Sequence, residues 1–180
     1  MTRMLEDVID EEEAIGDERL ADAARLGAAI LSQPISELAT LKPTVCVAPS
    51  VTVRVAIERM NQIKAGCVLV EQDGRLVGIF TERDVLTKVV GSGLNIDRTR
   101  IDSLMTRDPE TLGPNDAVAY ALNMMSVGGF RHIPLVVEDG RPVGVVAMRN
   151  VVDYIVELIP SGVLNLPPST QKFPRAREGA

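Results

Sequence analysis

A threonine and an aspartate three positions apart, Thr81 and Asp84, are the pair best suited to chemistry in this sequence. They follow an apolar run that ends at Phe80 and open a helical pattern, so we expect them where a strand becomes a helix. Thr-x-x-Asp is close to a capping box, in which each side chain bonds the other residue's backbone N–H. The same geometry would also suit a ligand. A helix N-terminus attracts phosphate, and a carboxylate accepts charge-assisted bonds from two vicinal ribose hydroxyls. Both interpretations are open at this point.

An arginine and the only histidine of the chain stand side by side at Arg131 and His132, after two glycines and before an apolar strand. A guanidinium fork next to an imidazole would form a phosphate clamp. The structural alternative is equally open. Arg131 would then be a surface cation, and His132 would be a half-buried strand residue.

The cysteine and histidine counts exclude several classes of catalytic and metal site. Cys46 and Cys67 are 21 residues apart in apolar surroundings, which is typical of buried strand residues rather than of a Cys-x-x-Cys site. One histidine cannot supply a histidine-rich zinc site, and the sequence has no Gly-x-Ser-x-Gly nucleophile elbow. We therefore expect a protein that is not an enzyme and holds no metal or cofactor of its own.

An internal repeat organises the elements that must position these residues. The segment 69–85 recurs as 135–151 at an offset of 66, with Asp-Gly and a later glycine in both copies. Upstream, Ile-Ser-Glu-Leu at 35–38 corresponds to Ile-Asp-Ser-Leu at 101–104 at the same offset. A fixed internal period decides the fold class, so the chain is predicted to contain two copies of one unit.

Each copy is predicted to be a β-α-β-β-α unit. Apolar residues at helical spacing indicate the first helix, and Asp-Gly between two apolar runs is the strongest short signal for a β-hairpin. A unit of about 55 residues is marginal alone, so the two copies should pack face to face in an α+β fold with pseudo-two-fold symmetry. The expected strands are 44–47, 67–70, 76–80, 110–112, 133–137 and 143–146, and the expected last helices are 81–90 and 147–158.

Four regions follow along the chain. They are an acidic N-terminal tail and helix (1–32), the first repeat (33–91), the second repeat (99–158) and an extended, proline-rich C-terminal tail (159–180).

The formal charge of −6 is concentrated at the N-terminus. Residues 1–18 contain eight carboxylates and one arginine, so the remainder is close to neutral. Without a basic stripe, and with only 3% aromatic residues, nucleic acid is not expected as the main partner. The longest apolar runs are far shorter than the about 20 residues that a spanning helix needs, and the N-terminus is unlike a secretory signal. We expect a cytoplasmic protein without a membrane partner.

The duplicated unit resembles a CBS-domain pair, or Bateman module, over residues 33–158. Gly-Ile-Phe-Thr-Glu-Arg-Asp closes the first copy, and Phe-Arg-His-Ile-Pro lies in the second. The resemblance implies an adenosine-containing ligand between the copies: AMP, ADP or ATP, or else S-adenosylmethionine or NAD. It also implies Mg²⁺ only together with ATP, and disc-shaped homodimers with a regulatory role.

Carried over by position, the resemblance implies one competent site per chain. Thr81 and Asp84 would hold ribose or phosphate, with Arg83 as a further phosphate contact. Arg131 and His132 would face the phosphates. The adenine would be bordered by backbone around Glu110, Thr111 and Leu112 and by a wall of Ile133 and Pro134.

The mirror site departs from this pattern. At the offset of 66, the counterparts of Thr81, Asp84, Arg131 and His132 are Ala147, Asn150, Ala65 and Gly66. We therefore expect a weak or empty second site. It would be bordered by Thr44, Val45, Arg149 and Asn150.

The leading hypothesis is a regulatory nucleotide-binding module that acts on a partner protein, because no catalytic or transport domain accompanies the repeats. One alternative is a structural dimerisation module with an empty cleft, in which Thr81 and Asp84 are capping residues only. Another is a module for a different adenosyl ligand, such as S-adenosylmethionine or NAD.

Overall fold

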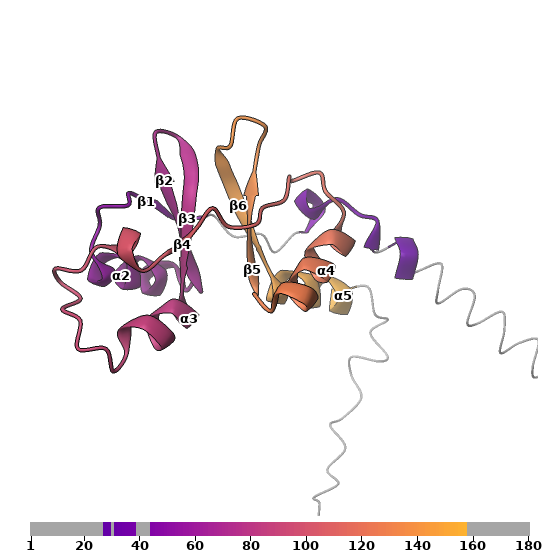
Figure 1. Ribbon diagram of the computed structural model, residues 1–180. Coiled ribbons are helices and arrows are strands. Elements are labelled where there is room, and N and C mark those ends of the chain that lie inside the picture. Colours follow the sequence, from indigo (N-terminus) through magenta and orange to yellow (C-terminus); the bar gives the residue numbers. More distant parts are fainter. Residues whose placement is uncertain (1–26, 30, 39–43, 158–180) are drawn as a thin grey trace, which may run out of the picture.

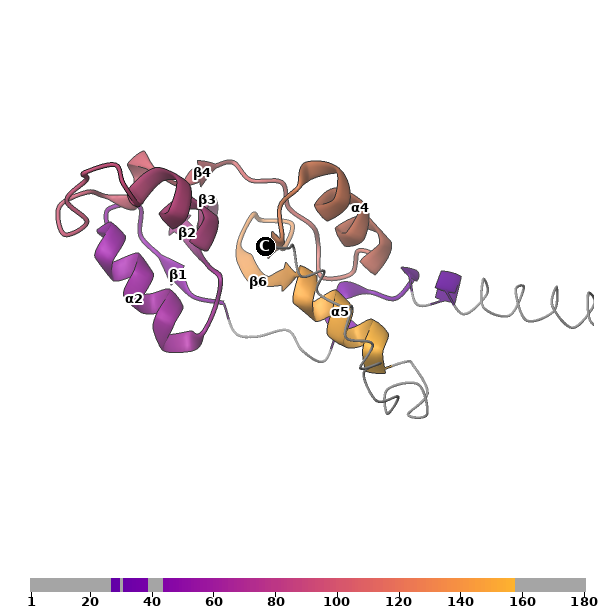
Figure 2. The same cartoon turned by 90° about the horizontal axis from the view of Figure 1, so that it is seen from below.

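The computed structural model describes residues 27–29, 31–38 and 44–157. Two lobes lie side by side, and each carries a β-hairpin that points in the same direction (Figure 1). We call the lobe that contains α2, β2 and β3 the first lobe and the lobe that contains α4, β5 and β6 the second lobe. Seen from below, the strands lie between α2 on one side and α4 and α5 on the other (Figure 2).

The first lobe follows the predicted order of strand, helix and hairpin. Its first helix begins at the N-cap Thr52, whose hydroxyl accepts from the backbone N–H of Val55, and ends at Lys64 in the left-handed conformation. The residues of β2 from Cys67 to Val70 are all buried, as expected for a strand covered on both faces. Its elements are β1 (Cys46–Val47), α2 (Val53–Ile63), β2 (Cys67–Gln72), β3 (Arg75–Thr81), α3 (Glu82–Asp84) and the π-helix η2 (Val85–Val89).

The second lobe repeats this order. Its first helix ends at Gly129, which takes the left-handed conformation that glycine adopts without strain. Its second strand leads directly into the last helix, as in the first lobe. The elements that follow η2 are η3 (Ile101–Ser103), β4 (Thr106–Arg107), α4 (Val118–Gly128), β5 (His132–Val136), β6 (Pro142–Ala147) and α5 (Met148–Glu157).

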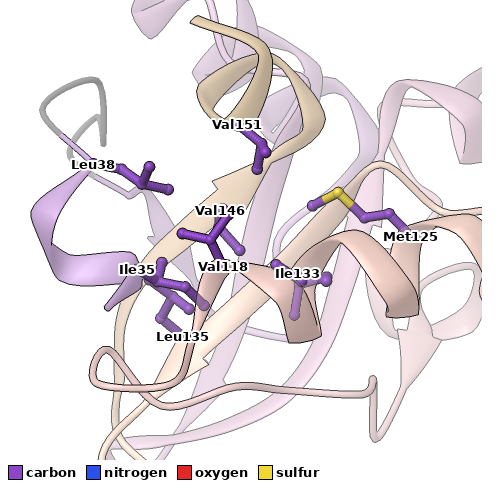
Figure 3. Close-up of a cluster of buried hydrophobic side chains, with 9 residues drawn as sticks. Ile35, Leu38, Val118, Met125, Ile133, Leu135, Val146 and Val151 are labelled. Atoms are coloured by element: carbon purple, nitrogen blue, oxygen red, sulfur yellow. The ribbon is translucent and has the colours of Figure 1, made fainter. Parts of the chain in front are cut away.

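The segment that precedes the first lobe in sequence packs into the core of the second lobe. In η1 (Ile35–Glu37), the backbone N–H of Ile35 donates to the carbonyl of Asp116 at 2.9 Å. The side chains of Ile35 and Leu38 are buried in one apolar cluster with residues of α4, β5, β6 and α5 (Figure 3).

The reciprocal segment, which follows the first lobe, packs into the first lobe. The backbone N–H of Ile101 donates to the carbonyl of Val51 at 3.0 Å, and Ile101 and Met105 are buried with residues of α2, β2 and β3. β4 pairs antiparallel with β3 and completes a sheet of order β1-β2-β3-β4. A Cβ on Gly78 would lie 2.5 Å from Sδ of Met105, so glycine is needed for this close approach. Each lobe therefore has an apolar core that a segment outside its own helices and hairpin completes: Ile35 and Leu38 complete the second lobe, and Ile101 and Met105 complete the first.

The two hairpins differ by one residue, and this changes the repeat offset. In the first, Gln72 pairs with Arg75 across a two-residue turn, whose Asp73 and Gly74 both have positive φ. In the second, the N–H of Val137 donates to the carbonyl of Arg141 across a three-residue turn, in which only the last residue, Gly140, has positive φ. Such three-residue loops are a common alternative hairpin connection.

The single offset of 66 is therefore wrong for part of the repeat. Pairing of Cys67 with Thr81 and of His132 with Ala147 makes Cys67 the counterpart of His132. Gly66 is then the counterpart of Arg131, since the carbonyls of both accept from the first residue of the last helix. From α2 to the first strand of the hairpin the offset is 65, and beyond the hairpin turn it is 66.

Other expected elements differ in extent. Of the expected strand 110–112, only Leu112 forms a bridge, to Leu135, and the strand before it is β4 at Thr106–Arg107. The expected helix 81–90 is α3 followed by the π-helix η2. Of the N-terminal helix, residues 27–29 and 31 are described and helical. Residues 1–26 and the tail from 158 lie outside the described residues.

Replacing Ile35 with alanine should destabilise the second lobe, although Ile35 lies outside it in sequence. The side chain is fully buried, and deleting such a side chain typically costs about 2–4 kcal/mol of unfolding free energy. Urea unfolding followed by circular dichroism measures the change. Val127→Ala, at a side chain that is 82% exposed, is the control and should change stability by less than about 0.5 kcal/mol. Equal effects of the two substitutions would contradict the exchange of segments.

Candidate functional site

Thr81 and Asp84 form a complete capping box at the end of β3. The backbone N–H and the hydroxyl of Thr81 donate to Oδ2 of Asp84 at 2.8 and 2.7 Å. The backbone N–H of Asp84 donates back to Oγ1 of Thr81 at 3.3 Å. These bonds begin α3 and hold the Asp84 carboxylate in one orientation.

The other carboxylate oxygen of Asp84 meets a lysine one turn further along. Lys88 Nζ lies 2.7 Å from Oδ1 of Asp84 and also donates to the carbonyl of Leu104 at 2.6 Å. Lys88 thus links the capping aspartate to the segment that follows η3. Because a carboxylate oxygen has two lone pairs, Oδ1 keeps capacity for a further donor such as a ribose hydroxyl.

His132 begins β5 and Arg131 directly precedes it, two residues after the left-handed Gly129. Arg83 reaches across from the first lobe, and its Nη1 donates to the carbonyl of Gly129 at 2.7 Å. This bond ties the residue next to the capping box to the turn that precedes the arginine and histidine. The two motifs singled out in the sequence are therefore neighbours in space.

A cavity of about 750 Å³ lies between the two motifs. Its volume is in the range of about 300–1,000 Å³ that is typical of small-molecule sites. Asp84 of the first lobe and Arg131 of the second both line it. The remaining lining residues are Gly66, Ile79, Thr81, Glu82, Arg83, Thr106, Asp108, Pro109, Glu110, Phe130, His132, Ala147, Met148, Arg149 and Val152.

Six of the ten residues expected at the main site line this cavity: Thr81, Arg83, Asp84, Glu110, Arg131 and His132. The other four, Thr111, Leu112, Ile133 and Pro134, do not line it. Leu112 packs against the apolar core of the second lobe, and Ile133 is buried within that core. Pro134 lies in the middle of β5, opposite Val145. Thr111 is the fourth expected residue that does not line the cavity.

The imidazole of His132 fills the space above Gly66. A Cβ on Gly66 would lie 2.8 Å from Nε2 of His132 and 3.4 Å from Oε2 of Glu82. Histidine and glutamate thus flank one spot, although they come from opposite lobes. Burial lowers the pKa of His132 below its usual value, and Glu82 offsets part of this lowering.

Glu82 and Gly66 were missed in the sequence. Glu82 stood only as a spacer between Thr81 and Asp84, and an exposed glutamate at a helix start is ordinarily explained by the helix dipole. Gly66 precedes a strand, where glycine is ordinary. The sequence does not show that Glu82 and Gly66 both lie against His132 of the other copy.

The mirror position lacks cations, but its residues are not those expected. The counterparts of Arg131 and His132 are Gly66 and Cys67, not Ala65 and Gly66. Burial and the nearby Glu82 raise the pKa of the Cys67 thiol to about 12, so it stays neutral. Asn150 repeats the cap of Asp84, because its Oδ1 accepts from the backbone N–H of Ala147 at 2.7 Å.

The other residues assigned to the mirror site are Arg149, Thr44 and Val45. Arg149 lines the cavity described above. Thr44 has a buried hydroxyl oxygen with no hydrogen-bond partner among the described residues, and Val45 packs against the apolar core of the first lobe.

The CBS domain family matches this chain twice, over residues 35–91 and 101–157. The chain belongs to the CBS domain family. The two matches confirm the CBS pair and the α+β fold predicted from the repeat. Each match begins at an exchanged segment, Ile35 or Ile101, which packs against the lobe formed by the other match.

Solved CBS structures share this fold. A CBS-domain containing protein from Agrobacterium tumefaciens is 30% identical, with a TM-score of 0.60 over 67% of this chain and 97% of that one. A CBS domain protein from Pyrobaculum aerophilum, complexed with AMP, is 25% identical, with a TM-score of 0.62 over 69% of this chain and 97% of that one.

Curated relatives include an uncharacterized 17.7 kDa protein of Acidianus ambivalens, 31% identical over 71% of this chain and 76% of its own length. A CBS domain-containing protein of Arabidopsis thaliana is 30% identical over 71% of this chain. This chain spans only 24% of that plant protein. In the part of the CBS pair that the structure describes, no helix is long and apolar enough to cross a membrane.

Gly66→Ala should displace the His132 imidazole and destabilise the protein by about 1–3 kcal/mol, as overpacking typically does. The same substitution in a His132→Ala background should cost much less, because the clash is gone. Chemical unfolding of the four proteins of this double-mutant cycle measures the coupling. Additive effects would show that the two residues do not compete for one space.

Acid should destabilise the protein through His132. The pKa of His132 is lowered in the folded state, whereas in the unfolded state it has the ordinary histidine value of about 6.5. As the pH falls through about 6.5, the unfolded state therefore binds more protons than the folded state, and the free energy of unfolding decreases. Melting temperatures from about pH 7.5 to 5.5 should therefore drop more for the wild type than for His132→Gln. Parallel curves for the two proteins would contradict the lowered pKa.

Proposed function

We propose that this CBS pair is a regulatory module that binds one adenine nucleotide per chain in the cavity between its lobes. One observation carries the proposal: the Asp84 carboxylate and the Arg131 guanidinium, from opposite lobes, line the same cavity. A carboxylate suited to ribose hydroxyls and cationic donors suited to phosphate thus converge on one space.

Each side chain has a defined task in this proposal. Asp84, already oriented by Thr81, accepts bonds from the ribose through Oδ1 and displaces or shares Lys88. Arg131 supplies the guanidinium fork to the phosphate, and His132 adds an imidazole donor. Phe130, Met148 and Val152 provide apolar surface of the kind that an adenine ring packs against.

The relative from Pyrobaculum aerophilum supports the class of ligand, because it is a CBS domain protein complexed with AMP. AMP is accordingly the first nucleotide to test, with ADP and ATP after it, and with Mg²⁺ only together with ATP. CBS domains are regulatory modules rather than enzymes as a class, and we propose the same here.

The regulatory output would arise from the arrangement of the two lobes. A ligand that contacts both lobes favours the arrangement in which both sets of groups reach it, by its differential affinity for the two states. The signal would pass to an effector protein. A homodimer in the cytoplasm is the proposed form.

A structural module without nucleotide is the second candidate, favoured by the completeness of the capping box. Thr81 and Lys88 already engage both oxygens of Asp84, so the residue has a stabilising role without any ligand. A module for S-adenosylmethionine or NAD would use the same ribose contact, and these compounds belong in the same titration.

Asp84→Asn separates binding from capping. Asparagine can keep the cap, as Asn150 does on Ala147, but it loses the negative charge. AMP at about 100 times its Kd should stabilise the wild type by about 2.7 kcal/mol. Asp84→Asn should lose most of this gain, while without AMP it should lose only the smaller contribution of the Lys88 ion pair.

Thermal melts give the stability, and isothermal titration gives a stoichiometry of one per chain. Asp73→Asn, in the hairpin turn, is the matched control and should keep the AMP response. Equal losses for Asp84→Asn with and without AMP would instead establish the purely structural role.

A further inference from the structure

Among the described residues, only some of the charged side chains that line the cavity have an ion-pair or hydrogen-bond partner. Four carboxylates and three guanidinium groups line it, together with His132. Asp84 is the one carboxylate among them with a cationic partner among the described residues, Lys88. The lining carboxylates without one are Glu82, Asp108 and Glu110.

The cations are mostly engaged elsewhere. Arg83 donates to the carbonyl of Gly129, and Arg149 lies 3.5 Å from Asp153 on its own helix. Arg131 is the lining arginine whose side chain makes no hydrogen bond or ion pair among the described residues. The cavity therefore offers one free guanidinium and one imidazole to a phosphate.

The Glu82 carboxylate lies close to the imidazole of this pair of donors. Its Oε2 and the Nε2 of His132 both lie within 3.4 Å of the point where a Gly66 Cβ would stand. A phosphate that contacts the imidazole therefore approaches the Glu82 carboxylate as well. Like charges repel, and the repulsion grows with each further phosphate.

We propose that Glu82 is a specificity-determining residue that limits the phosphate charge this cavity accepts, so that a nucleoside monophosphate binds more tightly than a triphosphate. The inference rests on the proposed function, since it concerns the same cavity. A monophosphate places its charge against Arg131 and His132. The additional phosphates of a triphosphate meet unpartnered carboxylates instead.

The effect of Glu82 on a monophosphate is expected to be small, because the guanidinium of Arg131 and the imidazole of His132 face the single phosphate and offset the repulsion. Each additional phosphate adds only repulsion, so the ratio of the two affinities is what Glu82 controls.

Isothermal titration with AMP and with ATP, in buffer that contains EDTA, tests the inference. Wild type should bind AMP at least about tenfold more tightly than ATP. Glu82→Gln should tighten ATP binding about fivefold and leave AMP within about twofold, as expected for one partly solvated charge. Glu82→Ala should behave in the same way, because the charge decides the effect. Glu58→Gln, at an exposed glutamate on α2, should leave both affinities unchanged.

The outcomes separate this inference from the proposed function. Binding of neither nucleotide to the wild type would overturn the proposed function itself. Binding of both with an affinity ratio that the Glu82 variants do not change, or tighter binding of ATP by the wild type, would overturn the role of Glu82 and leave the nucleotide site standing.

Discussion

Ile35 and Ile101, each of which begins one CBS match but is buried in the core of the lobe formed by the other match, constrain the rest of this structure. A lobe without its exchanged isoleucine would have a gap in its core, which close-packed interiors do not tolerate. The exchange therefore ties the lobes together as firmly as it completes each of them. In this arrangement the end of β3 lies opposite the start of β5, and the cavity lies between these two strand ends.

The groups that line the cavity are held by structural bonds before any ligand arrives. Thr81 orients Asp84, and Arg83 fixes the turn before Arg131. Such bonds reduce the conformational entropy that a ligand would otherwise have to offset. Capping and binding, which look like rival explanations of Thr-x-x-Asp in the sequence, are compatible in the structure because the cap uses one carboxylate oxygen and leaves capacity on the other.

The repeat made the fold predictable from the sequence, because two copies of one pattern of strands, helices and Asp-Gly turns leave few arrangements. Thr81, Asp84, Arg131 and His132 were predictable for the same reason, as they stand at ends of strongly patterned strands. The exchange of η1 and η3 was not, since apolar residues do not encode which of two similar cores they enter. The one-residue difference between the hairpin turns was also hidden. It moved the counterpart of His132 from Gly66 to Cys67, which the strand pairing alone could show.

Gly66 and Glu82 show a second limit of sequence reasoning. Their importance comes from a contact with His132 that crosses between the lobes, and no local pattern carries that information. Charged residues that belong to a recognisable motif were found, whereas Gly66 and Glu82, which belong to no such motif, were missed.

Interlocked cores have an evolutionary consequence. A gene fragment that carried one lobe without the isoleucine of the other repeat would encode a protein with an unfilled apolar core and an exposed apolar side chain. A cut between the two matches would separate Ile35 and Ile101 from the cores that they complete, whereas a cut outside residues 35–157 would keep both with their cores.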